Sequence, residues 1–206
     1  LDAANTKSYP GTGTTWFDQS GNGRNGTLTN SPTFSNNTAT FNGTSQRIEF
    51  ADDSELDFLG TASYTLEAFV KPASSGWTSP SWRGIFNRER NGTDHDIASE
   101  RYTSGTALSA YSNNYSSDFI RDNNHHIVAT YDGSNIKLYV NSELKLTRAD
   151  TSSITNTSQT FQIGSRGTQS TAHFPGQINV AKVYNRALTD SEVAQNYEAL
   201  RGRFGL

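Results

Sequence analysis

The sequence predicts an all-β protein, and three observations carry that prediction. Short runs that alternate polar and apolar residues recur along the chain, and turn-forming residues separate them. Most of the polar residues are Ser, Thr, Asn and Gly, which favour strands joined by tight turns. A helical pattern stands out in one place, near the C-terminus. Many short strands at this spacing are typical of a β-sandwich or a β-barrel.

The predicted strands follow from period-two alternation. The segment 47–50 alternates polar and apolar residues, and the segment 64–70 places Tyr64, Leu66, Ala68 and Val70 on one face. Further strands are expected at 127–131, 135–140, 162–163 and 177–184.

Turn chemistry separates these runs. Asp132-Gly133 lies between two predicted strands, and both residues tolerate the positive φ that a two-residue hairpin turn requires. Asn141-Ser142 marks the next reversal. Consecutive strands here are therefore expected to pair as antiparallel neighbours.

One short helix is expected at 190–200. Thr189 followed by Glu192 forms a capping box at its start. Gly202 can end the helix. Three apolar residues fall on one helical face, Val193, Tyr197 and Leu200.

Length, charge and composition narrow the function. The 206 residues fit one domain spanning 1–206, and the absence of Cys excludes disulfides and thiolate metal sites. The net charge is −3, with no basic stripe, so no nucleic-acid partner is expected. No apolar run approaches the ~20 residues that span a bilayer, so no membrane insertion is expected.

Three stretches of the chain carry family-like motifs. The first is the Trp/Asp/Ser-Gly-Asn-Gly loop at 16–27. The second is Phe41-Asn42-Gly43-Thr44, followed by the strand at 64–70 and Lys71-Pro72. The third begins with His125-His126, continues through the strands at 127–140, and ends in Val183-Tyr184-Asn185-Arg186-Ala187-Leu188. Together these stretches cover nearly the whole chain in order, and they resemble the laminin-G-like domains of the concanavalin A-like lectin/glucanase superfamily.

The resemblance implies a jelly roll, in which two antiparallel sheets pack face to face and carry one short C-terminal helix. The family occurs as glycan-binding or adhesive modules, as appended domains of secreted enzymes and in bacteriophage structural proteins. The resemblance therefore implies an extracellular or virion-surface location. The opening segment 1–11 looks like the phage version. The chain departs from the family pattern at Asn124, where a Trp is usual, and at Asn179 and Val180, where an acidic pair is usual.

A calcium site is one interpretation of the loop after Trp16. Asp18, Ser20 and Asn22 have the alternating oxygen spacing of the first half of a calcium loop, and Gly23 permits a sharp bend. The family resemblance brings the strand around Asn179 near this loop, so Asn179 is a further candidate ligand. The alternative is a plain Asx-rich turn that closes the sandwich.

Aromatic residues on predicted loops are candidate ligand-binding residues. Trp77, Trp82 and Tyr111 lie among Ser, Gly and Pro, and exposed rings stack well on sugar faces. Two alternatives remain: a protein interface with another subunit, and packing within the domain.

Evidence for catalysis in the sequence is weak. Related glucanases use a strand with Glu-x-Asp and a further Glu. Glu55 and Asp57 match the first two positions, but Gly60 stands where a third acid would be expected. His125 and His126 match a structural strand of the family and are predicted to pack. No catalytic residue is assigned.

The sequence therefore predicts a non-catalytic surface or adhesion module that binds cell-surface glycans or neighbouring subunits, with many copies in a larger assembly. Calcium is its candidate cofactor. A purely structural decoration or assembly domain of a viral particle is the first alternative, and a glucanase-type glycoside hydrolase is the second.

Overall fold

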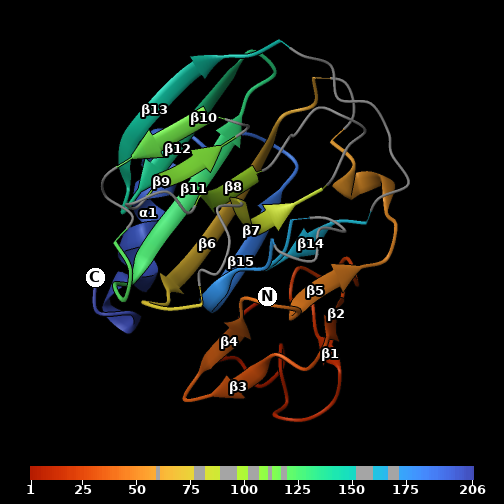
Figure 1. The fold of residues 1–206 in the computed structure, drawn as a ribbon. Helices are drawn as coiled ribbons and strands as arrows, with labels where there is room; N and C mark the ends of the chain where they lie inside the picture. Colours follow the sequence, from red (N-terminus) through yellow and green to blue (C-terminus); the bar gives the residue numbers. More distant parts are fainter. Residues whose placement is uncertain are drawn as a thin grey trace.

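The computed structural model describes residues 1–58, 61–76, 82–88, 97–101, 107–110, 113–116, 120–151, 160–166 and 172–206. For residues 82, 97–101, 107–110 and 113–116 it describes the backbone alone. Within these ranges, two antiparallel sheets pack face to face (Figure 1). The predicted all-β sandwich is confirmed.

The described strands of the first sheet, called sheet A, number seven. In spatial order they are β13 (Glu143–Ala149), β12 (Asn135–Val140), β11 (His125–Tyr131), β6 (Tyr64–Pro72), β15 (Pro175–Tyr184), β4 (Thr38–Asn42) and β3 (Thr33–Ser35). The Asp132-Gly133 turn joins β11 to β12, whose register pairs Tyr131 with Ile136. Gly133 has a φ of 94°, but Asp132 does not have a positive φ, and four residues separate Tyr131 from Ile136, so the hairpin is present without the predicted two-residue turn.

The second sheet, sheet B, has eight strands within the described residues. Their order is β1 (Thr15–Trp16), β2 (Gly26–Thr29), β5 (Arg47–Phe50), β14 (Gln162–Ile163), β7 (Trp82–Asn87), β8 (Ile97–Arg101), β9 (Ala107–Ala110) and β10 (Asn113–Ser116). A short 3-10 turn, η1 (Ser54–Leu56), follows β5.

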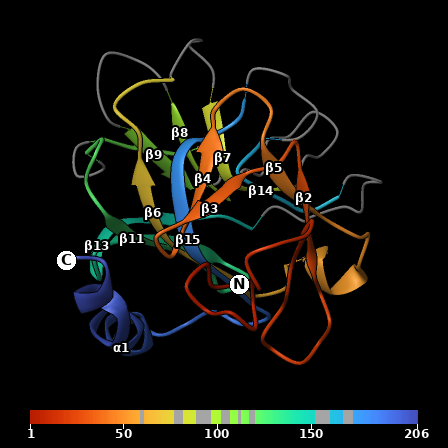
Figure 2. The same ribbon diagram turned by 90° about the horizontal axis from the view of Figure 1, so that it is seen from below.

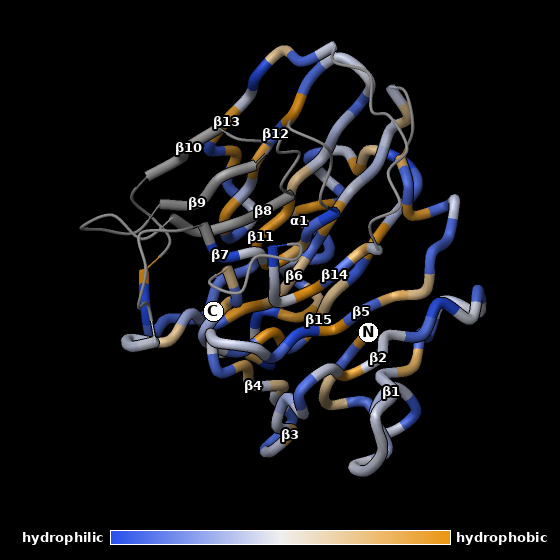
Figure 3. The backbone as a smooth tube through the Cα atoms, turned by 45° about the vertical axis from the view of Figure 1, so that its right-hand side comes forward, coloured by the Kyte–Doolittle hydropathy of each residue, from blue (hydrophilic) through white to orange (hydrophobic). Residues whose placement is uncertain are grey.

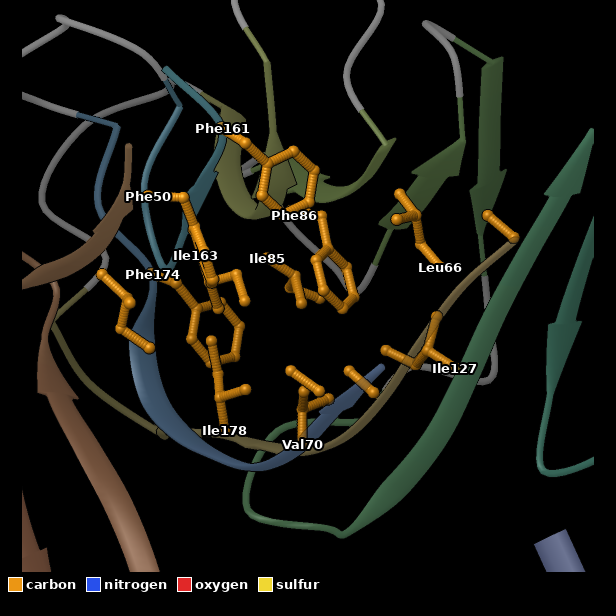
Figure 4. Close-up of a cluster of buried hydrophobic side chains, with 14 of the residues drawn as sticks. Phe50, Leu66, Val70, Ile85, Phe86, Ile127, Phe161, Ile163, Phe174 and Ile178 are labelled. Carbon is orange, nitrogen blue, oxygen red and sulfur yellow. The ribbon is translucent and has the colours of Figure 1, made fainter. Parts of the chain in front are cut away.

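The core lies between the sheets, where the inward faces of the strands meet. The predicted inward residues Tyr64, Leu66, Ala68 and Val70 of β6 are all buried in it. Figure 4 shows Phe86 and Phe161 above the curved strands of sheet A, and their ring centroids lie 6.2 Å apart. Figure 3 shows hydrophobic segments along β14, in sheet B, and along β15, in sheet A. The sequence has a modest apolar content, and large aromatic side chains fill much of the core.

A β-bulge in β15 shapes the region described below. The register against β6 shifts between Ile178 and Val180, which leaves Asn179 as the extra residue. Residues 1–3 run along the opposite edge of this bulge. Ala3 N donates to Asn179 O at 2.9 Å, and Ala181 N donates to Leu1 O at 3.1 Å.

Helix α1 (Asp190–Leu200) lies on the outer face of sheet A (Figure 2). The predicted capping box is present, because the Thr189 side chain accepts from Glu192 N while Glu192 Oε2 accepts from Thr189 N. Val193 is fully buried in a small cluster with Val128, Tyr139 and Leu188. No described helix is long and apolar enough to cross a membrane.

The predicted bounds of the helix are confirmed, but the predicted role of Gly202 is not. Its last residue is Leu200, and the chain continues into a second 3-10 turn, η2 (Arg201–Arg203), which contains Gly202. The C-cap is Arg201 in a right-handed conformation, so Gly202 does not supply a left-handed cap.

Candidate functional site

A groove with a volume of about 700 Å³ opens beside β15, and its lining comes from the N-terminus, the loop at 18–24, the segment 50–58 and the C-terminal end of α1. Its floor is apolar and includes Phe50, Phe58, Phe161, Ile163 and Val183. Its rim is polar and includes Asp18, Ser20, Asn22, Glu55, Lys182 and Asn185. An apolar floor with a few polar groups at the mouth is the usual form of a small-molecule site.

The loop at 18–24 forms one wall of this mouth, and the Asp18 carboxylate organises it. Asp18 Oδ1 accepts from Ser20 N at 2.8 Å, while Asp18 Oδ2 accepts from Ser20 Oγ at 2.6 Å and from Arg24 N at 3.1 Å. Partial burial raises the pKa of Asp18, but these hydrogen bonds outweigh it and hold the pKa below its usual value. The side chain therefore acts as an Asx-turn anchor and remains ionised at neutral pH.

Three of the four predicted calcium ligands meet at this mouth, and the fourth lies behind it. Asp18, Ser20 and Asn22 line the groove, and Asn22 Nδ2 donates to Ser20 Oγ at 3.0 Å. Asn179 is not part of the lining, although its neighbour Val180 is. The Asn179 side chain is buried, and its Oδ1 lacks a hydrogen-bond partner within the described residues.

The fit of these residues to a calcium ion is partial. The loop contributes one carboxylate, and calcium prefers several charged or neutral oxygens around it. Across the described part of the chain, no group of three or more Asp, Glu and His side chains is placed to hold a metal. The unsatisfied Asn179 oxygen is the observation that favours a cation nearby, because a buried polar atom without a partner is costly.

The two acids of the Glu55-x-Asp57 motif do not face each other as a catalytic pair. Glu55 lies in η1 and Asp57 is its C-cap, so neither lies on a strand and alternate residues do not share one face. Glu55 is exposed on the groove rim, whereas Asp57 is buried and forms an ion pair with Arg88. The two side chains therefore lie in different surroundings.

A buried polar cluster beneath α1 was not predicted from the sequence. Glu67 on β6 is completely buried, and its carboxylate accepts from Lys182 Nζ at 2.8 Å, Tyr184 OH at 3.0 Å and Asn196 Nδ2 at 2.7 Å. His126 Nε2 lies 3.2 Å from Glu67 Oε1. Burial raises the pKa of Glu67, but the His126 contact and the Lys182 charge more than reverse this and lower the pKa.

One signal for this cluster exists in the sequence. Glu67 occupies an outward position in the middle of an apolar strand, where alternation permits a polar residue. What the alternation cannot reveal is that α1 covers this position. The predicted packing role of His126 is confirmed, because its ring is fully buried and stacks on Phe69 with centroids 4.5 Å apart. His125 is also buried.

The predicted sugar-stacking residues cannot be placed with their side chains. Trp77 and Tyr111 lie outside the described residues. Trp82 is the first residue of β7, and its backbone alone is described. Their role therefore stays a prediction.

Solved structures with the same fold include a neurotoxin receptor-binding domain, a domain of an extracellular arabinanase and a sialidase. The receptor-binding domain of a botulinum neurotoxin C/D mosaic serotype aligns with a TM-score of 0.65 at 13% identity, over 89% of this chain and 48% of that one. Domain 4 of AbnA, an extracellular arabinanase of Geobacillus stearothermophilus, aligns with a TM-score of 0.56 at 19% identity, over 89% and 81%. Trypanosoma rangeli sialidase aligns with a TM-score of 0.68 at 13% identity, over 92% and 32%.

These likenesses show the fold. The chain spans about half the length of the neurotoxin domain and about a third of the sialidase. A search of curated proteins gave no match. The model of the concanavalin A-like lectin/glucanase superfamily matches residues 42–194, well over half of the sequence, and the chain therefore belongs to that superfamily.

Proposed function

We propose that this chain is a non-catalytic module that binds glycans at an extracellular or virion surface. The observation that carries the proposal is the groove beside β15, which joins an aromatic floor to a polar rim in a lectin/glucanase fold. Phe50 and Phe58 form part of an apolar floor with less than a tenth of each side chain exposed, and rim amides such as Asn185 offer hydrogen bonds to hydroxyls.

The structural neighbours support the same substrate class. The AbnA domain was solved with arabinotriose and the sialidase with sialic acid, so this fold accompanies carbohydrate recognition in both proteins. The fold also forms the receptor-binding domain of a neurotoxin. A shared fold does not show that two proteins bind the same ligand. The proposal that this chain binds glycans therefore rests on the residues of the groove rim.

Binding without cleavage follows from the acids at the groove. Retaining glycoside hydrolysis needs two carboxyl groups about 5 Å apart, one acting as acid and the other as nucleophile. Three acids line the groove. Asp18 accepts three hydrogen bonds from its own loop and Asp2 is paired with Arg203, which leaves Glu55 without a second uncommitted carboxylate among these lining residues. We therefore expect bound polysaccharide to remain intact.

A glycan array followed by a matched pair of variants tests the proposal. Asn185 is exposed on the groove rim, and Asn123 is equally exposed but lies before β11, outside the groove lining. Asn185→Ala should weaken binding to an array-positive glycan about tenfold, the effect of losing roughly 1.4 kcal/mol. Asn123→Ala should leave the affinity unchanged, and both variants should have the melting temperature of the native protein.

Two results would count against this reading. Equal affinity for both variants would remove the groove as the glycan site and leave the loop aromatics Trp77, Trp82 and Tyr111 as candidates. If no glycan binds and the protein instead assembles on a particle or with a partner chain, the decoration or assembly function replaces it. Shortened polysaccharide after incubation would support the hydrolase alternative.

Calcium is proposed as the cofactor of the loop at the groove mouth. Asp18, Ser20 and Asn22 would supply oxygens from the loop, and Asn179 a neutral oxygen from β15. An ion that binds only the native state stabilises it by about 2.7 kcal/mol at a hundred times its dissociation constant. Calcium should therefore raise the melting temperature relative to chelator.

The control for calcium is the response of a variant to the ion. Asp18→Ala lowers stability by breaking the Asx turn, so the comparison is the calcium-induced shift within each protein. The native protein should shift and Asp18→Ala should not. Identical melting of the native protein in chelator and in excess calcium contradicts a stabilising site.

A further inference from the structure

The sequence contains four Asn-Gly pairs, and the structure sets one of them apart. Asn22-Gly23, Asn25-Gly26 and Asn42-Gly43 lie within the described residues, and Asn91-Gly92 lies outside them. An Asn-Gly pair is chemically reactive because the glycine has no Cβ to hinder attack of its backbone nitrogen on the asparagine side chain. Whether that attack occurs depends on the freedom of both groups.

At Asn22-Gly23 the two reacting groups have few contacts with the rest of the fold. Asn22 is exposed, and no described donor contacts its Oδ1; its amide nitrogen makes a surface hydrogen bond to Ser20 Oγ at 3.0 Å. The Gly23 N–H has no hydrogen-bond acceptor among the described residues. A Cβ built on Gly23 would meet nothing within 4 Å, so the space around the attacking nitrogen is open.

The other two described pairs are held by the fold. Gly26 begins β2 and pairs with Trp16 on one side and Phe50 on the other. Asn42 Oδ1 accepts from the backbone nitrogens of three successive residues, 44, 45 and 46, while Gly43 packs against Pro175. Reaction at either pair therefore requires local opening of structured backbone.

We propose that Asn22 is a site of spontaneous deamidation in the native protein. The Gly23 backbone nitrogen, after losing its proton to solvent, bonds to Asn22 Cγ. The Cγ–Nδ2 bond then breaks and ammonia leaves, which forms a cyclic succinimide. Water opens the ring at either carbonyl and yields aspartate or isoaspartate. The net reaction consumes one water, releases one ammonia and leaves a carboxylate, with no oxidation or reduction.

The new charge appears in the loop of the proposed calcium site. It lies four residues from Asp18 in the loop that lines the groove mouth, and it makes the net charge of −3 one unit more negative. The aspartate product would give the loop the pattern Asp18-x-Ser20-x-Asp, and cation affinity rises with the number of ligand charges. This second step rests on the proposed calcium site, whereas the deamidation itself does not.

Trypsin separates the reactive residue from its internal controls. Cleavage after Lys7, Arg24 and Arg47 gives a peptide 8–24, whose only Asn is Asn22, and a peptide 25–47, which holds Asn25 and Asn42. The native protein is incubated at mildly alkaline pH, digested and analysed by mass spectrometry for the conversion of amide to acid. Conversion at Asn22 should exceed that at Asn25 and Asn42 by about tenfold or more, because those sites react through local opening.

Two controls test whether the fold causes the difference between the sites and whether the reaction occurs at Asn22. In denaturant the three sites should react at similar rates, which shows that the native difference comes from the fold. Asn22→Gln keeps an amide but forms its ring more slowly, so its peptide 8–24 should stay unconverted. Equal conversion of the three sites in the native protein, or protection of Asn22, overturns the proposal.

A separate measurement tests whether the new carboxylate strengthens calcium binding. Asn22→Asp should show a larger calcium-induced rise in melting temperature than the native protein. If calcium shifts neither protein, the calcium proposal fails while the deamidation result stands. If calcium shifts the native protein and Asn22→Asp by the same amount, the new carboxylate does not bind the ion, and the charge step is wrong.

Discussion

Removing the charge of Glu67 should strongly destabilise the protein, because that carboxylate joins β6, β15 and α1. Its oxygens accept from Lys182, Tyr184 and Asn196, and His126 lies at 3.2 Å. Each hydrogen bond to a charged group contributes about 1.5–3 kcal/mol, and breaking a buried ion pair costs about 3–5 kcal/mol. Glu67→Gln keeps the size of the side chain and one acceptor oxygen. We therefore expect the free energy of unfolding to fall by about 3 kcal/mol, near the lower end of the range for a broken buried ion pair.

Urea unfolding followed by tryptophan fluorescence measures this loss, since Trp16 is completely buried in the folded state. The matched control is Glu198→Gln on the exposed side of α1, where the Glu198–Arg201 pair lies at the surface. Exposed pairs contribute about 0–1 kcal/mol. If Glu67→Gln costs no more than Glu198→Gln, the cluster does not hold the helix, and the reasoning fails.

The same variant has a predictable pH dependence. The folded-state pKa of Glu67 is lowered, so its stabilising contribution is complete above the unfolded pKa of about 4.3 and is lost as pH falls through the folded value. The stability gap between the native protein and Glu67→Gln should therefore be constant near neutral pH and narrow below about pH 4. A gap that widens in acid would contradict an ionised Glu67.

Three further substitutions test the fold. Phe174→Ala should cost about 3–5 kcal/mol in urea unfolding, because its fully buried side chain fills the inter-sheet core; a loss under 1 kcal/mol would contradict that packing. Thr189→Ala should cost about 1 kcal/mol by removing the capping box of α1, and unchanged stability would refute the cap. Gly176→Ala should lower the melting temperature, because its φ is 141° and a Cβ would lie 2.3 Å from Lys71 O, whereas Gly202→Ala has open space and should have little effect. If the two glycine variants have the same melting temperature, the fold accommodates a Cβ at Gly176 without losing stability.

Much of the fold could be predicted because local patterns and packing agree. The segments 47–50 and 135–140 are strands with the predicted bounds, since alternation there coincides with one buried face. The capping box at Thr189 placed the start of α1 correctly, because it depends on two neighbouring side chains. The helix also ends at Leu200 as predicted, but its C-cap is a right-handed Arg201, so the capping role expected of Gly202 was wrong.

The groove and the buried cluster could not be predicted because both arise from distant segments. Phe50, Phe161 and Val183 come from three strands or loops that only the sheet order brings together. Sequence spacing did find Asp18, Ser20 and Asn22 as one unit, since these residues lie in a single tight loop. Asn179 was reached through family resemblance, and its bulge is a property of the pairing between β15 and β6.

Chemical-shift mapping of a glycan titration tests the central claim most directly. An array-positive oligosaccharide is added to isotope-labelled protein, and the backbone amide signals are followed to saturation. The account predicts shifts concentrated at the groove rim, at Ser20, Asn22 and Asn185, with the sugar recovered intact. Shifts confined to residues away from β15 and the loop at 18–24 would contradict the groove, and unchanged signals with every array-positive glycan would contradict glycan binding itself.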